Sequence, residues 1–336
     1  MQQQKLPSVS FIIPTLNAEK LLPKCLAAIR SQDYPKEKIE IIISDGGSKD
    51  RSLLIAKQFK AKIIKNPEIL HEQGKSRAVK YAKGEILFFT DSDNILSHNR
   101  WVLDMIQPYL EHPNVQGFLP QTIPASDSNS LDRYLGYLFT DPFTWFVYQK
   151  SADPKFFEDI YMPLYKTRAY TLFQFSPKQL PLFGLSQGVG VHRKFERTGI
   201  GYSDDILAGM KLIKEGGIIA YVPSAGVYHY HVSGLMNFIR KYRWRIRNNL
   251  TGRIAGMGII HRIHYFPFTK KARIAIFPLY ALSIVFPLAD SLLLALRYRS
   301  FVMLWHMPVT IILALLMFLE YVKIRFSRRI ELGSYE

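Results

Sequence analysis

The sequence predicts an α/β protein, in which helices cover both faces of a mostly parallel sheet, followed by an apolar helical hairpin. Over the first 120 residues, short apolar runs alternate with helix-like segments, which is typical of parallel sheets buried on both faces. Near the C-terminus, the apolar stretches 274–296 and 301–322 are each long enough to cross a bilayer as a helix.

The expected elements alternate regularly along the chain, and polar residues follow three of the strand-like runs. Because parallel strands present their carboxyl ends at one edge, where such sheets bind ligands, residues 15–17, 45–47 and 91–93 are expected to share one rim. The strand-like runs are 9–15, 39–47, 61–66 and 85–90, and the helix-like segments are 18–32, 50–59 and 74–84.

The segment "TDSDN" at 90–94 has two interpretations. Aspartate and asparagine commonly cap helices and shape loops, and two carboxylates one residue apart also suit a metal ion. The shared rim favours the metal, and the pentapeptide alone leaves both open.

Composition and charge exclude several classes of protein. The single cysteine, Cys25, rules out an intrachain disulfide and a cysteine-based zinc site, and no secretory signal is recognisable at the N-terminus. A net charge of +17 is compatible with nucleic-acid binding. However, the basic residues cluster at 240–253, 261–273 and 323–329, beside the apolar stretches. This placement indicates a cytoplasmic membrane surface and no nucleic acid partner.

The apolar stretches are separated only by "RYRS", so two transmembrane helices in a tight hairpin are expected. More basic residues flank the outer ends than the turn, which places both termini in the cytosol. Pro278 and Pro287 predict kinks, and Asp290 should face protein or an interface. A buried helical pair or a re-entrant hairpin remains the alternative.

Four segments carry a resemblance to a known family: "SFIIPTLNAEKLLPKCLAAIRSQDYP", "IEIIISDGGSKD", "GKSRAVKYAKGEILFFTDSDN" and "DDILAGMKLIKEGG", in that order. Together they resemble the inverting nucleotide-sugar glycosyltransferases of family 2, over roughly residues 8–230. The resemblance implies a GT-A fold, a Rossmann-like mixed sheet, and a UDP- or GDP-sugar donor.

The resemblance assigns the donor site residue by residue. Asp45 would hydrogen-bond the nucleotide base, although a turn after the strand explains it equally well. Lys75 and Arg77 would neutralise phosphate charge, and Lys80 departs from the family, where asparagine is common. The implied donor-binding residues are Pro14, Thr15, Asn17, Asp45, Gly46, Gly74, Lys75, Arg77, Asp91 and Ser92.

The family's DxD motif corresponds to Asp91-Ser92-Asp93 and implies Mn²⁺ or Mg²⁺ as cofactor. Hard oxygen ligands suit these ions, which stabilise a departing diphosphate. Asp93 is expected to be the more direct ligand. Some members add a histidine after a later strand, which makes His229 a candidate, although isolated histidines are more often structural.

The acid pair Asp204-Asp205 corresponds to the family's Glu-Asp pair, whose second residue is the general base. Acids at a helix start are also ordinary helix chemistry. The preceding segment 184–199 resembles the acceptor side. Residues 240–249 are similar to the Q-x-x-R-W element of processive members, with Arg240 in place of glutamine. Arg240, Arg243 and Trp244 would contact the acceptor or a lipid phosphate, or anchor an interfacial helix.

These expectations combine into a membrane-anchored, metal-dependent inverting glycosyltransferase with a polyprenyl-phosphate-linked acceptor. It would be a multi-pass protein of the cytoplasmic membrane, with its catalytic domain and both termini in the cytosol. Alternatives are a subunit of a processive polysaccharide synthase and a catalytically silent nucleotide-sugar-binding scaffold. The expected organisation is a cytosolic catalytic domain (1–235), a basic interfacial segment (236–273), two transmembrane helices (274–322) and a basic tail (323–336).

Overall fold

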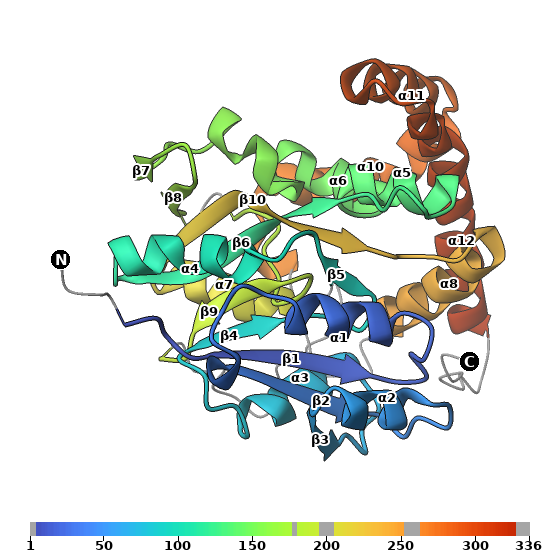
Figure 1. Ribbon diagram of the computed structural model, residues 1–336. Coiled ribbons are helices and arrows are strands. Elements are labelled where there is room, and N and C mark those ends of the chain that lie inside the picture. Colours follow the sequence, from blue (N-terminus) through green and yellow to red (C-terminus); the bar gives the residue numbers. More distant parts are fainter. Residues whose placement is uncertain (1–4, 177–179, 195–204, 252–262, 327–336) are drawn as a thin grey trace. The chain divides into compact units, whose positions relative to one another are not determined.

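The computed structural model describes residues 5–176, 180–194, 205–251 and 263–326, and the chain divides into two compact units (Figure 1). The first unit consists of residues 1–123 and 154–229, and the second of residues 124–153 and 230–336. The first, which carries the residues expected to form the catalytic site, is called the catalytic unit below, and the second is called the helical unit.

A single sheet forms the centre of the catalytic unit, with strand order β3-β2-β1-β4-β9-β6-β10-β8-β7 and β5 paired with β10. The first four of these are mutually parallel, as are β6 and β10, whereas β9, β8, β7 and β5 pair antiparallel. The predicted mixed, mostly parallel sheet is therefore confirmed. The strands are β1 (Val9–Thr15), β2 (Ile39–Asp45), β3 (Lys62–Lys65), β4 (Ile86–Phe89), β5 (Asn94–Leu96), β6 (Val115–Ile123), β7 (Tyr165–Lys166), β8 (Thr171–Gln174), β9 (Val189–His192) and β10 (Ile218–His229).

Both faces of the sheet are covered, because successive side chains of a strand point to opposite sides. Phe11 and Phe88 belong to one core cluster, whereas Ile12 and Phe89 belong to the other. This explains why the strands read as continuous apolar runs. The helices of this unit are α1 (Leu22–Arg30), α2 (Ser52–Gln58), α3 (His71–Val79), α4 (Trp101–Glu111) and α7 (Asp205–Lys214), with 3₁₀ turns at Lys36–Lys38 and Pro154–Asp159.

The helical unit combines an insertion between β6 and β7 with the C-terminal helices around a third core cluster. Aromatic residues from both parts build this core, including Phe146 stacked on Tyr280 at 4.2 Å between ring centroids. Its helices are α5 (Ser130–Leu138), α6 (Pro142–Tyr148), α8 (Leu235–Thr251), α10 (Phe268–Leu282), α11 (Val285–Tyr298) and α12 (His306–Phe326), with 3₁₀ turns at Gln149–Ala152, Ile263–Tyr265 and Phe301–Trp305.

The two apolar stretches differ in structure. Residues 301–326 form a helix long and apolar enough to cross a membrane, judged by length and composition, whereas α10 and α11 meet at 95°. The expected hairpin of two transmembrane helices is thus not confirmed, although a bend in the first apolar stretch was expected from its prolines. Ile284 has a positive φ of 61°, and Pro287 lacks the N–H that would continue the helical ladder to Ser283.

Polar side chains inside the helical unit are paired with one another. Tyr134 and Tyr280 hydroxyls lie 3.0 and 3.1 Å from the two ring nitrogens of His306, and the Tyr280 hydroxyl donates to Asp290 at 2.7 Å. Asp290, which is half-buried, therefore faces protein.

Glu320 ties α12 to α8. Its carboxylate has a side-chain exposure of 1% and accepts from Arg243 Nε at 2.8 Å and Arg247 Nε at 3.0 Å. A buried carboxylate in an apolar helix is tolerated only when it is paired in this way.

We expect Glu320→Ala to lower the free energy of unfolding of the helical unit by about 2–4 kcal/mol, because two arginines lose their shared partner. Thermal unfolding of the purified protein in detergent, followed by circular dichroism, measures the change. Lys323→Ala, at an exposed position of the same helix, is the matched control, and equal stability of the two variants would contradict the pairing.

Candidate active site

The loops after β1 and β2 are joined through Asn17. Its backbone N–H donates to Ser48 Oγ at 3.0 Å, and its Oδ1 accepts the Lys49 N–H at 2.9 Å. Asn17 adopts a positive φ of 47°, a conformation that asparagine tolerates better than most residues. Two predicted donor-binding loops are therefore held side by side at the carboxyl end of the sheet.

Asp45 shapes the second of these loops. It is 8% exposed, and its Oδ2 accepts N–H groups from Gly47 at 2.9 Å and Ser48 at 3.1 Å. These bonds confirm that Asp45 shapes a turn after β2. Base recognition by the remaining acceptor capacity of this carboxylate stays a prediction.

Gly74 lets α3 pass directly over the ends of β1 and β2. A Cβ at this position would lie 3.0 Å from Asn66 Nδ2, 3.2 Å from Ser44 Oγ and 3.3 Å from Pro14 Cβ. Thr15, at the end of β1, is 4% exposed, and a Cβ on Gly46 would come within 3.3 Å of the Ile69 carbonyl. Close packing therefore accounts for both glycines.

Lys75 and Arg77 have different surroundings. Lys75 is 2% exposed, and its ammonium lies 3.1 Å from Glu72 Oε1 and 3.5 Å from Asp91 Oδ1. Arg77 pairs with Glu68 at 2.8 Å in a more exposed position. Lys75 therefore pairs with the DxD motif, a contact that the sequence did not predict. The predicted phosphate contacts of Lys75 and Arg77 stay predictions.

The DxD segment is held by Asn94. Asn94 Oδ1 accepts the Asp91 N–H at 2.9 Å, and the Asn94 N–H donates to the Asp91 carbonyl at 3.0 Å. Asn94 opens β5 and pairs with His229, the last residue of β10. This register brings His229 Nε2 to 3.7 Å from Asp93 Oδ1, so two of the proposed metal ligands meet.

The pKa of Asp91 is lowered from its ordinary value. Burial by itself raises the pKa of this carboxyl, but the Lys75 ammonium, with His71 and His229, outweighs burial. Asp91 therefore remains a carboxylate at neutral pH, flanked by Lys75.

These residues fit part of a metal-binding site. Asp91 Oδ1 is buried 3.5 Å from the Lys75 ammonium and makes no closer hydrogen bond among the described residues. Asp93 adds a second hard oxygen beside His229. No group of three or more His, Cys, Asp or Glu residues in the described part of the chain forms a ready metal cage. Diphosphate oxygens and water commonly complete such sites for Mg²⁺.

Asp205 opens α7 and lies against the predicted acceptor segment. Its carbonyl accepts the Leu185 N–H at 3.3 Å, and a Cβ on Gly184 would approach its Oδ2 to 3.0 Å. The absent side chain of Gly184 thus leaves room beside the carboxylate. Asp204 lies outside the described residues.

The acceptor candidates Arg240, Arg243 and Trp244 lie on α8 in the helical unit. Arg243 is engaged by Glu320, and contact of these three with an acceptor stays a prediction. Glu72 and Asn94 were not among the predicted site residues. Glu72 stands one helical turn before Lys75, at a spacing that allows an ion pair, and Asn94 completes "TDSDN".

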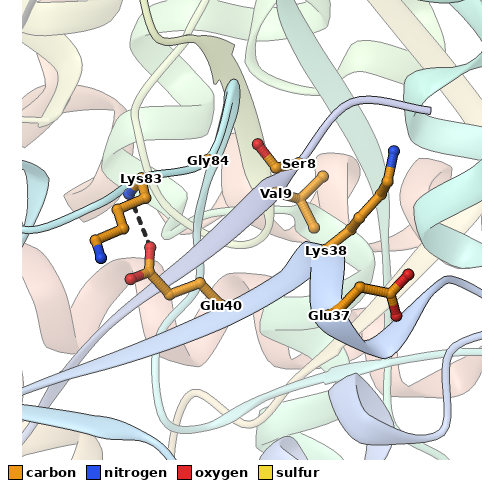
Figure 2. Close-up of a pocket in the computed structure, with 7 residues that line it drawn as sticks. All are labelled: Ser8, Val9, Glu37, Lys38, Glu40, Lys83 and Gly84. Carbon is orange, nitrogen blue, oxygen red and sulfur yellow. Dashed lines mark hydrogen bonds between the residues drawn. The ribbon is translucent and has the colours of Figure 1, made fainter. Parts of the chain in front are cut away.

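A hollow of about 240 Å³ lies elsewhere in the catalytic unit, where β1 and β2 begin (Figure 2). Glu40 already accepts the Lys83 N–H there at 2.8 Å and the Ser10 hydroxyl at 2.6 Å. Because the hollow lies where β1 and β2 begin, and Asp45 is the last residue of β2, the hollow does not belong to the candidate site. It is lined by Ser8, Val9, Glu37, Lys38, Glu40, Lys83 and Gly84.

The mixed, mostly parallel sheet, with the DxD segment after β4, is the arrangement of a GT-A glycosyltransferase. The chain belongs to glycosyl transferase family 2, whose family model matches residues 10–170. It is 30% identical over 132 residues to the N-acetylglucosaminyltransferase of Bradyrhizobium elkanii, covering 37% of this chain and 70% of that protein.

Further comparisons bear on the protein. A dolichyl N-acetyl-alpha-D-glucosaminyl phosphate 3-beta-D-2,3-diacetamido-2,3-dideoxy-beta-D-glucuronosyltransferase of Methanococcus voltae is 50% identical over 54 residues, which are 16% of this chain and 17% of that protein. The chain also spans about a third or less of several other curated relatives. The mannosyltransferase PcManGT from Pyrobaculum calidifontis, solved with GDP-Man and Mn²⁺, shares the fold with a TM-score of 0.50 at 17% identity, covering 97% of this chain and 89% of that one.

We expect Lys75→Met to destabilise the catalytic unit by about 1–3 kcal/mol at pH 7, because Asp91 loses its buried counter-charge. In the wild type the lowered Asp91 pKa favours folding above the ordinary value of 3.8, and this contribution is lost as pH falls through the lowered pKa. In the variant, burial without Lys75 raises that pKa, so protonation relieves the penalty. The difference between the two proteins should therefore shrink as pH falls from 7 to 4.5.

Urea unfolding in the presence of a chelator measures this difference at the two pH values. Arg77→Met, which removes an exposed ion pair on the same helix, is the matched control. A difference that stays constant with pH would contradict the assigned partnership of Lys75 and Asp91.

Proposed function

We propose that the protein is a metal-dependent inverting glycosyltransferase that moves a sugar from a nucleoside diphosphate to a membrane-associated acceptor. One observation carries the proposal. Residues 184–188 connect Asp205 with the DxD segment. The Leu185 N–H donates to the Asp205 carbonyl at 3.3 Å, and the Gly188 N–H donates to the Phe89 carbonyl at 2.8 Å. Phe89 ends β4, two residues before Asp91.

Asp205 is the proposed general base. The acceptor hydroxyl oxygen bonds to the anomeric carbon while the bond from that carbon to the diphosphate oxygen breaks, and Asp205 takes the hydroxyl proton. Gly184 leaves room for the acceptor beside this carboxylate. Attack from the face opposite the leaving group inverts the anomeric centre.

Asp93, Asp91 and His229 would hold Mn²⁺ or Mg²⁺, which neutralises charge on the departing diphosphate. Lys75 keeps Asp91 ionised and orients it toward the donor side. Asp45, Asn17 and Thr15 form the proposed nucleotide end of the site, where Asp45 would accept an N–H from the base.

The proposed acceptor is a polyprenyl-phosphate-linked sugar or phosphate. The exposed apolar residues of the helical unit and its basic helix α8 support a lipid-bound acceptor, as does the dolichyl phosphate named for the Methanococcus relative. A role in a processive synthase is less favoured, because Arg240 replaces the glutamine of the Q-x-x-R-W element. A silent scaffold is less favoured, because the chain keeps Asp45, Asp93 and Asp205 together.

We expect Asp205→Asn to reduce kcat for sugar transfer by about 10²–10⁴, the usual contribution of a general base, with donor affinity unchanged. Release of UDP or GDP by purified protein, Mn²⁺ and polyprenyl phosphate vesicles gives the rate for each nucleotide sugar in a panel. Asp33→Asn, at an exposed position outside the site, is the control. Turnover of Asp205→Asn equal to that of the control would refute the assignment.

We expect Asp93→Asn to weaken nucleoside diphosphate binding at least about 10-fold with Mn²⁺ present, because a carboxylate ligand is lost. With a chelator, the variant and the wild type should bind equally weakly. Isothermal titration calorimetry separates these cases, and a Mn²⁺-independent loss of affinity would assign Asp93 to the nucleotide rather than to a metal.

A further inference from the structure

The helical unit exposes more apolar surface than a water-soluble domain normally does. The exposed fractions are 75% for Leu279, 68% for Val285, 63% for Phe286, 62% for Leu293, 76% for Leu296 and 62% for Phe318. These residues come from α10, α11 and α12, the helices that composition alone assigns to a membrane.

Helix α8 sets a limit on how these helices meet a membrane. It buries Phe238, Tyr242 and Ile246 on one face and carries five basic residues, Arg240, Lys241, Arg243, Arg245 and Arg247. A charged side chain at the centre of a bilayer costs about 2.5–3.5 kcal/mol even on the most lenient scale. A position of α8 within the hydrocarbon is therefore unfavourable, whereas a membrane surface suits its charges.

The beginnings of α5 and α8 are fixed to each other. Asn129 Nδ2 donates to the Val232 carbonyl at 2.8 Å, and the Val232 N–H donates to Asp132 Oδ1 at 2.7 Å. Residues 124–129 and 230–234 connect these helices to β6 and β10. Six extended residues reach about 20 Å, less than the hydrocarbon thickness of about 30 Å. The chain that leads to each helix start is therefore too short to cross the hydrocarbon.

Helix α12 is attached to α5 at its start and to α8 near its end. At its start, Trp305 Nε1 donates to Ser130 Oγ at 3.1 Å and His306 meets Tyr134 at 3.0 Å. Fourteen residues later, about 21 Å along the helix, Glu320 binds Arg243 and Arg247. Helices α8 and α12 thus pack along each other (Figure 1).

We infer that the helical unit is embedded in one leaflet of an anionic membrane, with α12 lying along the surface beside α8 rather than crossing the bilayer. If α12 crossed, α8 and its five cations would have to cross with it. The 95° bend between α10 and α11, held by the bond between Tyr280 and Asp290, fits an element that enters and leaves by the same side.

A lipid leaflet matches the charges around this apolar surface. Lys271, Arg297, Arg299, Lys323 and Arg325 are exposed near the ends of α10, α11 and α12, where they can reach anionic headgroups. A second copy of this chain would bring the same positive charges against one another. The inference replaces the expected transmembrane hairpin but keeps both ends of the described helical unit on the side of the catalytic unit.

Cysteine labelling tests the topology. In a Cys25→Ser background, single cysteines replace Lys57 in the catalytic unit, Ser300 between α11 and α12, and Arg325 after α12. A membrane-impermeant maleimide is applied to inside-out and right-side-out vesicles from expressing cells, and labelling in detergent verifies that each cysteine reacts. Arg299→Cys and Lys323→Cys are second variants for any position that is unreactive or impairs folding.

We expect the cysteines at 57, 300 and 325 to be labelled from one and the same side. In a two-helix hairpin, position 300 would be labelled from the opposite side, and with a single spanning α12, positions 300 and 325 would be labelled from opposite sides. Either result would overturn the inference. Labelling of position 300 in detergent alone would also overturn it, because the turn would then lie in the hydrocarbon.

Discussion

The antiparallel pairing of β5 with β10 is the contact on which the candidate site depends. Strand β5 is only three residues long, yet it follows the DxD segment directly and ends the run that begins at β4. Its register places Asn94 opposite His229, so a histidine more than 130 residues away in the chain reaches Asp93. Asn94 also closes the turn around Asp91. One short ladder therefore fixes the acidic loop and supplies its histidine.

Charge balance governs the other side of this loop. Asp91, Glu72 and Lys75 form a compact group in which two carboxylates share one buried ammonium. Such a group is costly to bury unless its members are paired, and its net negative charge together with Asp93 favours a divalent cation. The arrangement also explains why Lys75 and Arg77, two basic residues of α3, have different partners. Lys75 faces the sheet and the DxD segment, whereas Arg77 reaches Glu68 nearer the solvent.

The sequence predicted the alternating order of strands and helices because period and composition are local properties. It also predicted the shared rim, since parallel strands must end at one edge. Nothing local revealed that residues 124–153 pack with the C-terminal helices, or that Lys75 pairs with Asp91. Both depend on contacts between distant segments. The break at Ile284 was only partly visible, because Pro278 and Pro287 suggested kinks but not a positive φ at the residue between two helices.

Glu320 shows how one buried charge can change the interpretation of an apolar helix. Length and hydropathy qualify α12 as a membrane span, and these criteria ignore what packs against it. A carboxylate paired with two arginines of α8 cannot be separated from that helix without leaving uncompensated charge. The position of α12 in a membrane is therefore determined by the most polar helix attached to it. The exposed apolar residues then form the surface that contacts lipid, and α8 limits how deeply the helical unit enters the leaflet.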